Sequence, residues 1–594
     1  MFLLSAMRIR FSRPACFILA SYLLLSALPL LPVMLGRPPA APAALLGATV
    51  LSWLAVWALF GRPAFFHLLL LPAFLALPVE VYLQLYFGQG ISSHHLGVIA
   101  ETGPMEALEF VGNGLWLLLA LLVLVCGWFV LVWRAALRGH ELEWRGASRL
   151  IVLAVFGVGM AVWLYGGAAV SGSSPALRQA SAPEHGDLPT WARISLNVPL
   201  VASSWPYGLG FQAYAFWRER VYLSQLAERS DAFRFHARQA ADGKAPRVVV
   251  MVLGESSRAD RWSLNGYARR TNPLLELEGN LVSLSDLVTP VSATRLSVPV
   301  MLSRKPATQS LRAGFSEKSF LSAYKEAGYK TFWLSNQMSF GEFDTPVSVF
   351  AKEADVTRFF NLGGFRNDSS HDEVLLTPLE QAIRDPADRK LIVLHTLGSH
   401  WNYSQRYPRQ FDRFQPSLFG VDKPAYTDLK LKTEINNSYD NAILYTDWLL
   451  AQVIAQLKAA PGVTAMMYVA DHGQTLYDGS CKLAFHGHNT QFEFHVPGLV
   501  WYSNAYGEAY PDKVAQLRRH SGAPLSTENV FHSLLDMADV HYPDEKLDRS
   551  LFSKNLSRHV RYVDSYGWTN YDDADFKGDC REVIGRKTPL PRDR

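Results

Sequence analysis

The fold of this 594-residue chain is decided by the stretch Arg247-Val-Val-Val-Met-Val-Leu-Gly-Glu-Ser-Ser-Arg258, an apolar run that ends in a carboxylate and hydroxyls. Such a run predicts a strand that is buried on both faces of a sheet. A second run, Ala465-Met-Met-Tyr-Val-Ala470, ends in Asp471-His-Gly473. Because ligands gather beyond the carboxyl ends of strands in open α/β sheets, we expect both polar ends to lie at one site.

The rest of this half of the chain alternates between short β-rich runs and helical or loop segments. This pattern predicts an α/β domain with a mostly parallel sheet flanked by helices. The longest predicted helix is Glu434–Lys458, and a second begins at Ser526–Thr527. The predicted strands are 247–253, 331–334, 390–397, 465–470 and 498–502.

The amino-terminal part has another composition, dominated by Leu, Ala, Val and Trp. Five stretches approach the ~20 apolar residues that cross a ~30 Å hydrocarbon core. They are 15–35, 43–60, 64–87, 115–133 and 150–170. We therefore predict a membrane domain over 1–170, a connector with amphipathic segments such as Phe211–Leu226 over 171–245, and a soluble domain over 246–594.

The arginines predict the orientation of these spans, because short cytoplasmic loops collect Lys and Arg. Arginines precede the first span and lie between the second and third and between the fourth and fifth spans, whereas 88–114 contains no Lys or Arg. The amino terminus is therefore predicted inside and the soluble domain outside the cytoplasm. A cleaved signal peptide at 15–35 is the alternative, but four further spans with consistent alternation disfavour it.

The charge of the chain argues against one class of partner. The net charge is +4, and Lys and Arg form no dense basic block. A protein that follows a nucleic acid backbone needs such a block, so nucleic acid is excluded as a partner.

The four cysteines fall into two groups. Cys16 and Cys126 lie in predicted spans and are interpreted as apolar fillers. Cys481 and Cys580 lie in the soluble domain, where an oxidising compartment would allow a disulfide between them. Two free thiols are the alternative.

The two strand ends together carry groups that bind a metal. Glu, Asp and His are zinc ligands, and a serine hydroxyl becomes a nucleophile when a metal lowers its pKa. Either pair alone, Glu255 with Ser256 or Asp471 with His472, also fits an ordinary strand-terminal turn. Both pairs together favour a metal site.

Several segments resemble one family. The segment 254–273 is similar to the nucleophile segment of the lipid A-type phosphoethanolamine transferases, in the alkaline phosphatase and sulfatase superfamily. Four further segments match that family in order: 289–303, 395–400 with 406–408, 437–447 and 471–473. The resemblance implies a five-helix transmembrane domain and an alkaline-phosphatase-like domain, in a multi-pass protein of the bacterial inner membrane with its catalytic domain in the periplasm.

The resemblance also implies a zinc site with four ligands, which are Glu255, Ser256, Asp471 and His472. Ser256 is then the residue that becomes covalently modified. The family has threonine at this position, and here a second serine, Ser257, follows. We assign the role to Ser256 because it comes directly after Glu255, and neighbours along an extended strand end point opposite ways.

The substrate-binding residues that the resemblance implies are Thr102, Glu106, Thr294, Ser297, His400, His486 and His488. Thr102 and Glu106 correspond to a segment that approaches the ethanolamine head group, where a carboxylate suits an ammonium. Val98 replaces a family asparagine nearby, and Glu80 in the third span is a weaker candidate. The pattern His-Gly-His leaves open which of its two histidines contacts the phosphate.

The predicted reaction transfers phosphoethanolamine from phosphatidylethanolamine to lipid A or another envelope glycan, through a covalent phosphoethanolamine-serine intermediate. The alternative is a membrane-tethered sulfatase or glycerol-phosphate transferase of the same superfamily, and a more distant one is a silent receptor with this fold. The sequence leaves open the acceptor, the number of metal ions and the oligomeric state.

Overall fold

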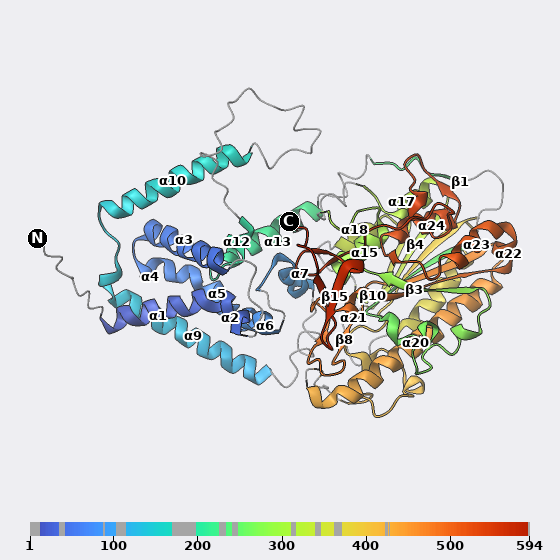
Figure 1. Cartoon of the computed structure of the whole chain (residues 1–594), viewed down its shortest axis with the longest axis horizontal. Helices are drawn as coiled ribbons and strands as arrows, with labels where there is room; N and C mark the ends of the chain where they lie inside the picture. The colour runs from blue at the N-terminus through green and yellow to red at the C-terminus, as the bar shows by residue number, and fades with distance from the viewer. Residues whose placement is uncertain are drawn as a thin grey trace, which may run out of the picture. The chain divides into compact units, whose positions relative to one another are not determined.

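The computed structural model describes residues 12–34, 42–86, 90–101, 115–168, 198–224, 233–239, 248–309, 317–338, 346–361, 371–421, 426 and 428–591. The chain divides into two compact units. The first comprises Met1–Glu101 and Gly114–Arg218, and the second comprises Thr102–Asn113 and Glu219–Arg594. Figure 1 labels many of the elements of both units.

Apolar helices build the first unit. Its helices are α1 (Arg13–Ala27), α2 (Leu31–Met34), α3 (Pro42–Phe60), α4 (Pro63–Phe66), α5 (Leu71–Leu75), α6 (Leu77–Tyr86), α7 (Ser93–Glu101), α9 (Leu115–Arg138), α10 (Ala147–Ala168), α12 (Val198–Ala202) and the start of α13 (Gly208–Ser224). Three helical segments are long and apolar enough to cross a membrane: Arg13–Met34, Pro42–Phe60 and Leu115–Arg138. A shorter apolar helix covers Ala147–Ala161.

The stretch predicted as one span at 64–87 is a bent pair of helices. Pro63–Leu75 and Leu77–Leu85 meet at 52°, and only together are they long and apolar enough to cross a membrane. Pro78 follows the break, and a proline removes an intrahelical hydrogen bond and clashes with the preceding turn. The described residues therefore contain three candidate spans, or up to four if the bent pair is one span.

Glu80 of α6 is buried and hydrogen-bonded within the first unit. Its Oε2 accepts from the Ile91 backbone N–H at 2.7 Å, and its Oε1 accepts from Gln84 Nε2 at 2.8 Å. These two bonds give the carboxylate a structural role in joining α6 to the segment before α7.

An eight-stranded sheet forms the centre of the second unit, in the order β11-β3-β10-β7-β2-β6-β4-β5. The strands are β2 (Val248–Gly254), β3 (Leu281–Val288), β4 (Lys330–Met338), β5 (Val356–Asn361), β6 (Lys390–His395), β7 (Thr464–Ala470), β10 (His495–Tyr502) and β11 (Leu525–Ser526). Among the neighbouring pairs, only those that include β10 are antiparallel. The predicted mostly parallel sheet is confirmed.

Helices flank this sheet. They are α15 (Thr294–Leu302), α17 (Phe320–Glu326), α18 (Pro346–Ala351), α19 (Leu376–Ile383), α20 (Lys432–Ala459), α21 (Gln491–Phe494), α22 (Asn504–Ala509), α23 (Pro511–Arg519) and α24 (Asn529–Met537). The helix α17 packs on β4 and α20 packs on β7, and Figure 1 shows the strands lying between α24 and α20. The predicted long helix is confirmed as α20.

The helix α24 begins later than the sequence predicts. Ser526 pairs with Val288 as part of β11, and Asn529 Oδ1 accepts from the Ser526 backbone N–H at 2.9 Å. The predicted start at Ser526–Thr527 is therefore wrong, because sheet pairing holds Ser526 in an extended conformation.

Short two-stranded sheets complete the second unit. They pair β1 (Arg238–Gln239) with β12 (Val540–His541), β8 (Thr475–Leu476) with β9 (Ala484–Phe485), β13 (Tyr562–Asp564) with β14 (Trp568–Asn570), and β15 (Ala574–Lys577) with β16 (Glu582–Gly585). A disulfide joins Cys481, between β8 and β9, to Cys580, between β15 and β16. The predicted pairing of these cysteines is confirmed.

Removal of this disulfide should destabilise the second unit. It closes a loop between positions 99 residues apart, and removal of a native disulfide typically costs about 2–5 kcal/mol. We expect a Cys481→Ala/Cys580→Ala variant of the full chain in detergent to unfold at a lower temperature, measured by scanning calorimetry. Cys126→Ala, which removes a thiol outside any disulfide, is the control. Equal Tm values for the two variants would contradict this expectation.

Candidate metal centre

The site forms where β2 and β7 end side by side. Gly254 pairs with Ala470 as the last residue pair of this parallel ladder. The Asp471 backbone N–H then donates to Gly254 O at 3.0 Å, which continues the pairing by one bond. Segments more than two hundred residues apart in sequence thus deliver their polar side chains to one place.

Three of the predicted metal ligands lie together there. Each of Glu255, Asp471 and His472 offers one ligand atom, and these atoms all lie within 4.8 Å of one another. All three side chains are buried. His472 Nε2 lies 3.5 Å from Glu255 Oε1 and 3.6 Å from Asp471 Oδ2. The three ligand atoms are therefore close enough together to bind one metal ion.

The hydroxyl of Ser256 belongs to the same cluster. Ser256 Oγ donates to Glu255 Oε1 at 2.6 Å, and the Ser256 backbone N–H donates to Asp471 Oδ1 at 3.0 Å. The backbone of Ser256 has a φ of 55°, in the left-handed region that costs a non-glycine residue about 1–3 kcal/mol. The surrounding contacts compensate for this strain.

The second serine points elsewhere. Ser257 Oγ accepts a hydrogen bond from Trp262 Nε1 at 2.9 Å, and Ser257 is buried. Of the two neighbouring hydroxyls, the one of Ser256 contacts the candidate ligands.

The residues of this cluster fit a zinc ion. Asp471 Oδ1 accepts from two backbone N–H groups, while its buried Oδ2 has no hydrogen-bond donor among the described residues. Burial and the neighbouring Asp471 carboxylate raise the pKa of Glu255. Two buried carboxylates at this distance are unfavourable without a cation between them. Carboxylate oxygens and an imidazole nitrogen are a ligand set that zinc accepts.

His472 has the orientation that a metal ligand needs. Its Nδ1 lies 2.9 Å from Gly473 O, so Nδ1 carries the proton and donates to this carbonyl. The lone pair of Nε2 is therefore directed toward the two carboxylates. Such a hydrogen bond from the second ring nitrogen fixes the tautomer of metal-binding histidines.

Thr294 reaches the cluster from α15. Its Oγ1 donates to Glu255 Oε2 at 3.1 Å and lies 3.3 Å from His472 Nε2. Ser297 lies one helical turn further on, fully buried, and its Oγ has no hydrogen-bond partner among the described residues. The structure thus joins Thr294, but not Ser297, to the cluster by hydrogen bonds.

The two histidines of the His-Gly-His pattern have different environments. The His486 ring lies 4.3 Å from the His472 ring, measured between centroids. His488 Nε2 instead lies 2.8 Å from Ala484 O, within its own turn. His486 is therefore the one that borders the candidate ligands.

His400 is half-buried in the loop that follows β6. Partial burial, together with the positive charge of Arg406, lowers the pKa of His400 to about 3. A neutral imidazole is therefore present at physiological pH. The predicted residues Thr102 and Glu106 lie outside the described residues.

A buried carboxylate that sequence reasoning missed holds the turn of His486. Glu493 accepts from the backbone N–H groups of Gly487 at 2.8 Å and His488 at 3.0 Å. Thr475 Oγ1 donates to it at 2.7 Å. Gly487 and His488 directly follow His486 in the chain, so Glu493 fixes the turn that carries the His486 ring.

Tyr439 of α20 supports the strained backbone of Ser256. Its hydroxyl donates to Ser256 O at 2.7 Å and accepts from the Arg258 backbone N–H at 2.9 Å. Tyr439 lies in the segment 437–447 that carries the family resemblance, but nothing in the sequence pattern indicated this role.

A glycine lets the loop after β6 approach Glu255. Gly398 has a φ of 48°, and a Cβ atom there would lie 2.8 Å from Glu255 O. The next residue, Ser399, donates its backbone N–H to the same carbonyl at 3.0 Å. Only glycine allows this close approach.

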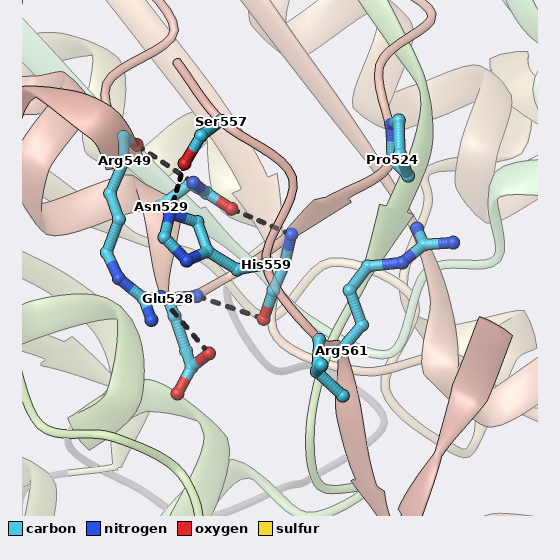
Figure 2. A pocket seen from close by; sticks show the side chains of 9 residues that line it. Pro524, Glu528, Asn529, Arg549, Ser557, His559 and Arg561 are labelled. Carbon is cyan, nitrogen blue, oxygen red and sulfur yellow. Dashed lines mark hydrogen bonds and ion pairs between the residues drawn. The ribbon is translucent and has the colours of Figure 1, made fainter. Parts of the chain in front are cut away.

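A small pocket elsewhere in the second unit is less suited to bind a ligand (Figure 2). It is lined by Pro524, Ser526, Glu528, Asn529, Arg549, Ser557, His559, Val560 and Arg561. Its arginines are already paired, Arg549 with Glu528 at 3.5 Å and Arg561 with Asp286 at 2.7 Å. The cluster at the β2 and β7 ends is therefore the stronger candidate site.

The geometry agrees with one family of known proteins. Residues 247–540 match the family model described as Sulfatase. The matched residues lie within the second unit and include the strands β2 and β7 that carry the cluster.

Curated relatives are named phosphoethanolamine transferases. Phosphoethanolamine transferase EptC of Escherichia coli is 28% identical over 375 residues, which are 61% of this chain and 63% of that protein. The Kdo(2)-lipid A phosphoethanolamine 7''-transferase of the same species is 30% identical over 356 residues, 58% of this chain and 60% of that protein. The chain thus matches somewhat less than two thirds of the length of these relatives.

Solved structures extend the similarity to the fold. The C-terminal periplasmic domain of E. coli EptC, crystallised as a complex with Zn, is 28% identical with a TM-score of 0.51, over 57% of this chain and 95% of that domain. The integral membrane protein EptA of Neisseria meningitidis is 21% identical with a TM-score of 0.63, over 90% of this chain and 98% of that chain. EptA shares the fold of almost the whole chain.

Removal of the Tyr439 hydroxyl should destabilise the protein, because two buried backbone groups then lose their partner. We expect Tyr439→Phe to lower the free energy of unfolding by about 1–3 kcal/mol in urea titrations. Tyr403 is the matched control, since it is also fully buried, its ring packs edge-to-face 5.0 Å from Tyr439, and its hydroxyl has no partner among the described residues. Equal losses in Tyr439→Phe and Tyr403→Phe would show that the bridge to Ser256 contributes nothing.

The Glu493 carboxylate should make stability depend on pH. Burial raises its pKa from 4.5 to about 7, so the folded state binds the extra proton between these values. Proton binding to Glu493 therefore stabilises the folded state. This contribution is fully present below about pH 4.5 and is lost as the pH rises through about 7. Across this window Glu493→Gln should change its stability relative to the wild type by up to about 3 kcal/mol, measured by urea unfolding at a series of pH values. Parallel pH curves for the two proteins would rule out this effect of Glu493.

Proposed function

We propose that this chain is a zinc-dependent phosphoethanolamine transferase of the bacterial inner membrane. The proposal rests on the hydroxyl of Ser256, which lies among three buried metal-ligand side chains in a sulfatase-family domain. The similar proteins named as phosphoethanolamine transferases support the identity of the transferred group, and the name of one of them gives Kdo(2)-lipid A as its acceptor. The donor is phosphatidylethanolamine, and the acceptor is lipid A or another envelope glycan.

The membrane domain is proposed to span the bilayer five times, with the catalytic domain of 246–594 in the periplasm after the connector of 171–245. Three candidate spans, the bent pair and α10 supply five helical segments of suitable composition. The fold similarity to an integral membrane protein over 90% of this chain supports a membrane anchor. A bilayer anchor suits an enzyme whose donor and acceptor are both confined to the membrane.

The proposed zinc ligands are Glu255, Ser256, Asp471 and His472. When bound, zinc supplies a Lewis acid that lowers the pKa of a coordinated hydroxyl. The buried Asp471 Oδ2 and the Nε2 lone pair of His472 support this ligand set.

In the first half-reaction, Ser256 Oγ forms a bond to the phosphorus of phosphatidylethanolamine, and the bond from phosphorus to the glycerol oxygen breaks. The serine proton ends on that oxygen, so diacylglycerol leaves as an alcohol. Phosphoethanolamine remains on Ser256. His486, whose ring lies 4.3 Å from the His472 ring between centroids, is proposed to relay the proton.

In the second half-reaction, an oxygen of the acceptor forms a bond to the same phosphorus, and the bond from phosphorus to Ser256 Oγ breaks. The acceptor proton returns to Ser256. Thr294 and neutral His400 are proposed to hydrogen-bond the phosphoryl oxygens, with Ser297 and His488 as weaker candidates. Thr102 and Glu106 are proposed to bind the ethanolamine head group.

A covalent adduct on Ser256 is the sharpest test of this function. We expect the purified chain, incubated with phosphatidylethanolamine and zinc, to carry phosphoethanolamine on the Ser256 peptide in mass spectrometry. Ser256→Ala should lose the adduct. Ser257→Ala should keep it, because the Ser257 hydroxyl contacts Trp262. An adduct on Ser257, or a sulfate or glycerophosphate on Ser256, would contradict the proposal and favour a related sulfatase or glycerol-phosphate transferase.

A further inference from the structure

A buried carboxylate holds the loop that follows β6. Asp372 Oδ1 accepts from the Leu397 backbone N–H at 2.8 Å, and Asp372 Oδ2 accepts from the Gly398 backbone N–H at 2.8 Å. Asn336 Nδ2 donates a third hydrogen bond, to Oδ1, at 2.9 Å. Asp372 is only 4% exposed, and all three of its partners are donors. This arrangement fits an ionised carboxylate, because such a group only accepts.

The loop that Asp372 holds lies directly against the main chain of a candidate ligand. The Ser399 backbone N–H donates to Glu255 O at 3.0 Å, and a Cβ atom on Gly398 would lie 2.8 Å from the same oxygen. The carboxylate of Glu255 is one of the three clustered ligand groups. A shift of the loop would therefore also move Glu255, so the contacts of Asp372 influence the geometry of the cluster.

The charge of Asp372 adds to the negative charge around the cluster. Its hydrogen-bond partners are all neutral groups, and burial of a carboxylate among neutral groups costs free energy. Burial raises the pKa of Tyr468 in β7, and the negative charges of Asp372 and of the two candidate carboxylate ligands raise it further. All three carboxylates thus act on one side chain, and a cation at the cluster would offset part of the cost of burying Asp372.

We propose that Asp372 is a positioning residue for the metal centre, which holds the loop after β6 against Glu255 and adds to the field that attracts the cation. The inference rests on the zinc site of the proposed function and is independent of the residue that attacks phosphorus. Changes to groups that support a metal ligand from behind typically weaken metal binding by about 10–100-fold.

The decisive variant is Asp372→Asn, which keeps the shape of the side chain but replaces one acceptor oxygen with an NH2 group. The backbone N–H of either Leu397 or Gly398 then loses its acceptor. We expect zinc to bind at least about tenfold more weakly than to the wild type. Zinc affinity is measured on the full chain in detergent, after removal of metal, by competition with a coloured zinc chelator.

The matched control is Asp447→Asn in α20. Asp447 is also buried, and its two oxygens accept from the adjacent backbone N–H groups of Leu274 and Leu275, each at 3.0 Å. Both variants should lower Tm, because each leaves a buried N–H group without its acceptor. Asp447→Asn should nevertheless bind zinc with the wild-type affinity. This comparison separates positioning of the metal centre from a general loss of stability.

A milder variant provides the test if Asp372→Asn does not fold. Asn336→Ala removes the side-chain donor to Asp372 and leaves both backbone hydrogen bonds in place. It should weaken zinc binding by about threefold or more, since the Asp372 carboxylate then loses one of its three fixed contacts.

Three outcomes overturn the role of Asp372. They are a zinc affinity of Asp372→Asn within about threefold of the wild type, equal weakening in Asp447→Asn, and, if Asp372→Asn does not fold, a wild-type affinity in Asn336→Ala. In each case the wild type still binds zinc, so the proposed function stands. A wild type that binds zinc but transfers no phosphoethanolamine removes the proposed function and leaves this inference. A wild type that binds no zinc removes both.

Discussion

The parallel pairing of β2 with β7 is the constraint on which the rest of this structure depends. Both strands are fully buried, so their backbone groups must bond to one another rather than to water. This requirement fixes the register of the two strands up to their last pair, Gly254 with Ala470. It therefore also fixes that the segments after β2 and β7 leave the sheet side by side. Glu255 and Asp471 meet for this reason.

That register brings two buried carboxylates, those of Glu255 and Asp471, close together. The Glu255 carboxylate accepts hydrogen bonds from the Thr294 and Ser256 hydroxyls. Asp471 Oδ1 accepts from backbone N–H groups, but Asp471 Oδ2 has no donor among the described residues. A protein interior tolerates such a pair when a cation lies between the carboxylates. The cluster is thus arranged for a metal, and the serine oxygen takes its position from the same contacts.

A second layer of residues from distant segments holds these groups in place. Tyr439 of α20 bridges the backbone around Ser256, and Gly398 lets the loop after β6 support Glu255. Glu493 binds the turn that carries His486. Strain at Ser256 persists because several elements over-determine its position, as is usual for residues at functional sites.

The sequence by itself determined the strands with continuous apolar runs, the helix α20, the disulfide partners and the residues at the two strand ends, because each follows from local pattern and residue chemistry. It missed β3, β5 and β11, since these strands are partly exposed or only two residues long. The five membrane spans and the roles of Thr102 and Glu106 stay predictions.

Only the tertiary structure decided which of the two histidines in the His-Gly-His pattern borders the candidate metal ligands, and it showed which contact turns the Ser257 hydroxyl away from them. Trp262 binds the Ser257 hydroxyl, and the Ala484 carbonyl binds His488, so the neighbours Ser256 and His486 remain for the site. The contacts of Asp372, Tyr439 and Glu493 were also invisible in sequence. Their partners lie far away along the chain or depend on side-chain direction, and hydrogen bonds of this kind leave no periodic pattern in the residues that make them.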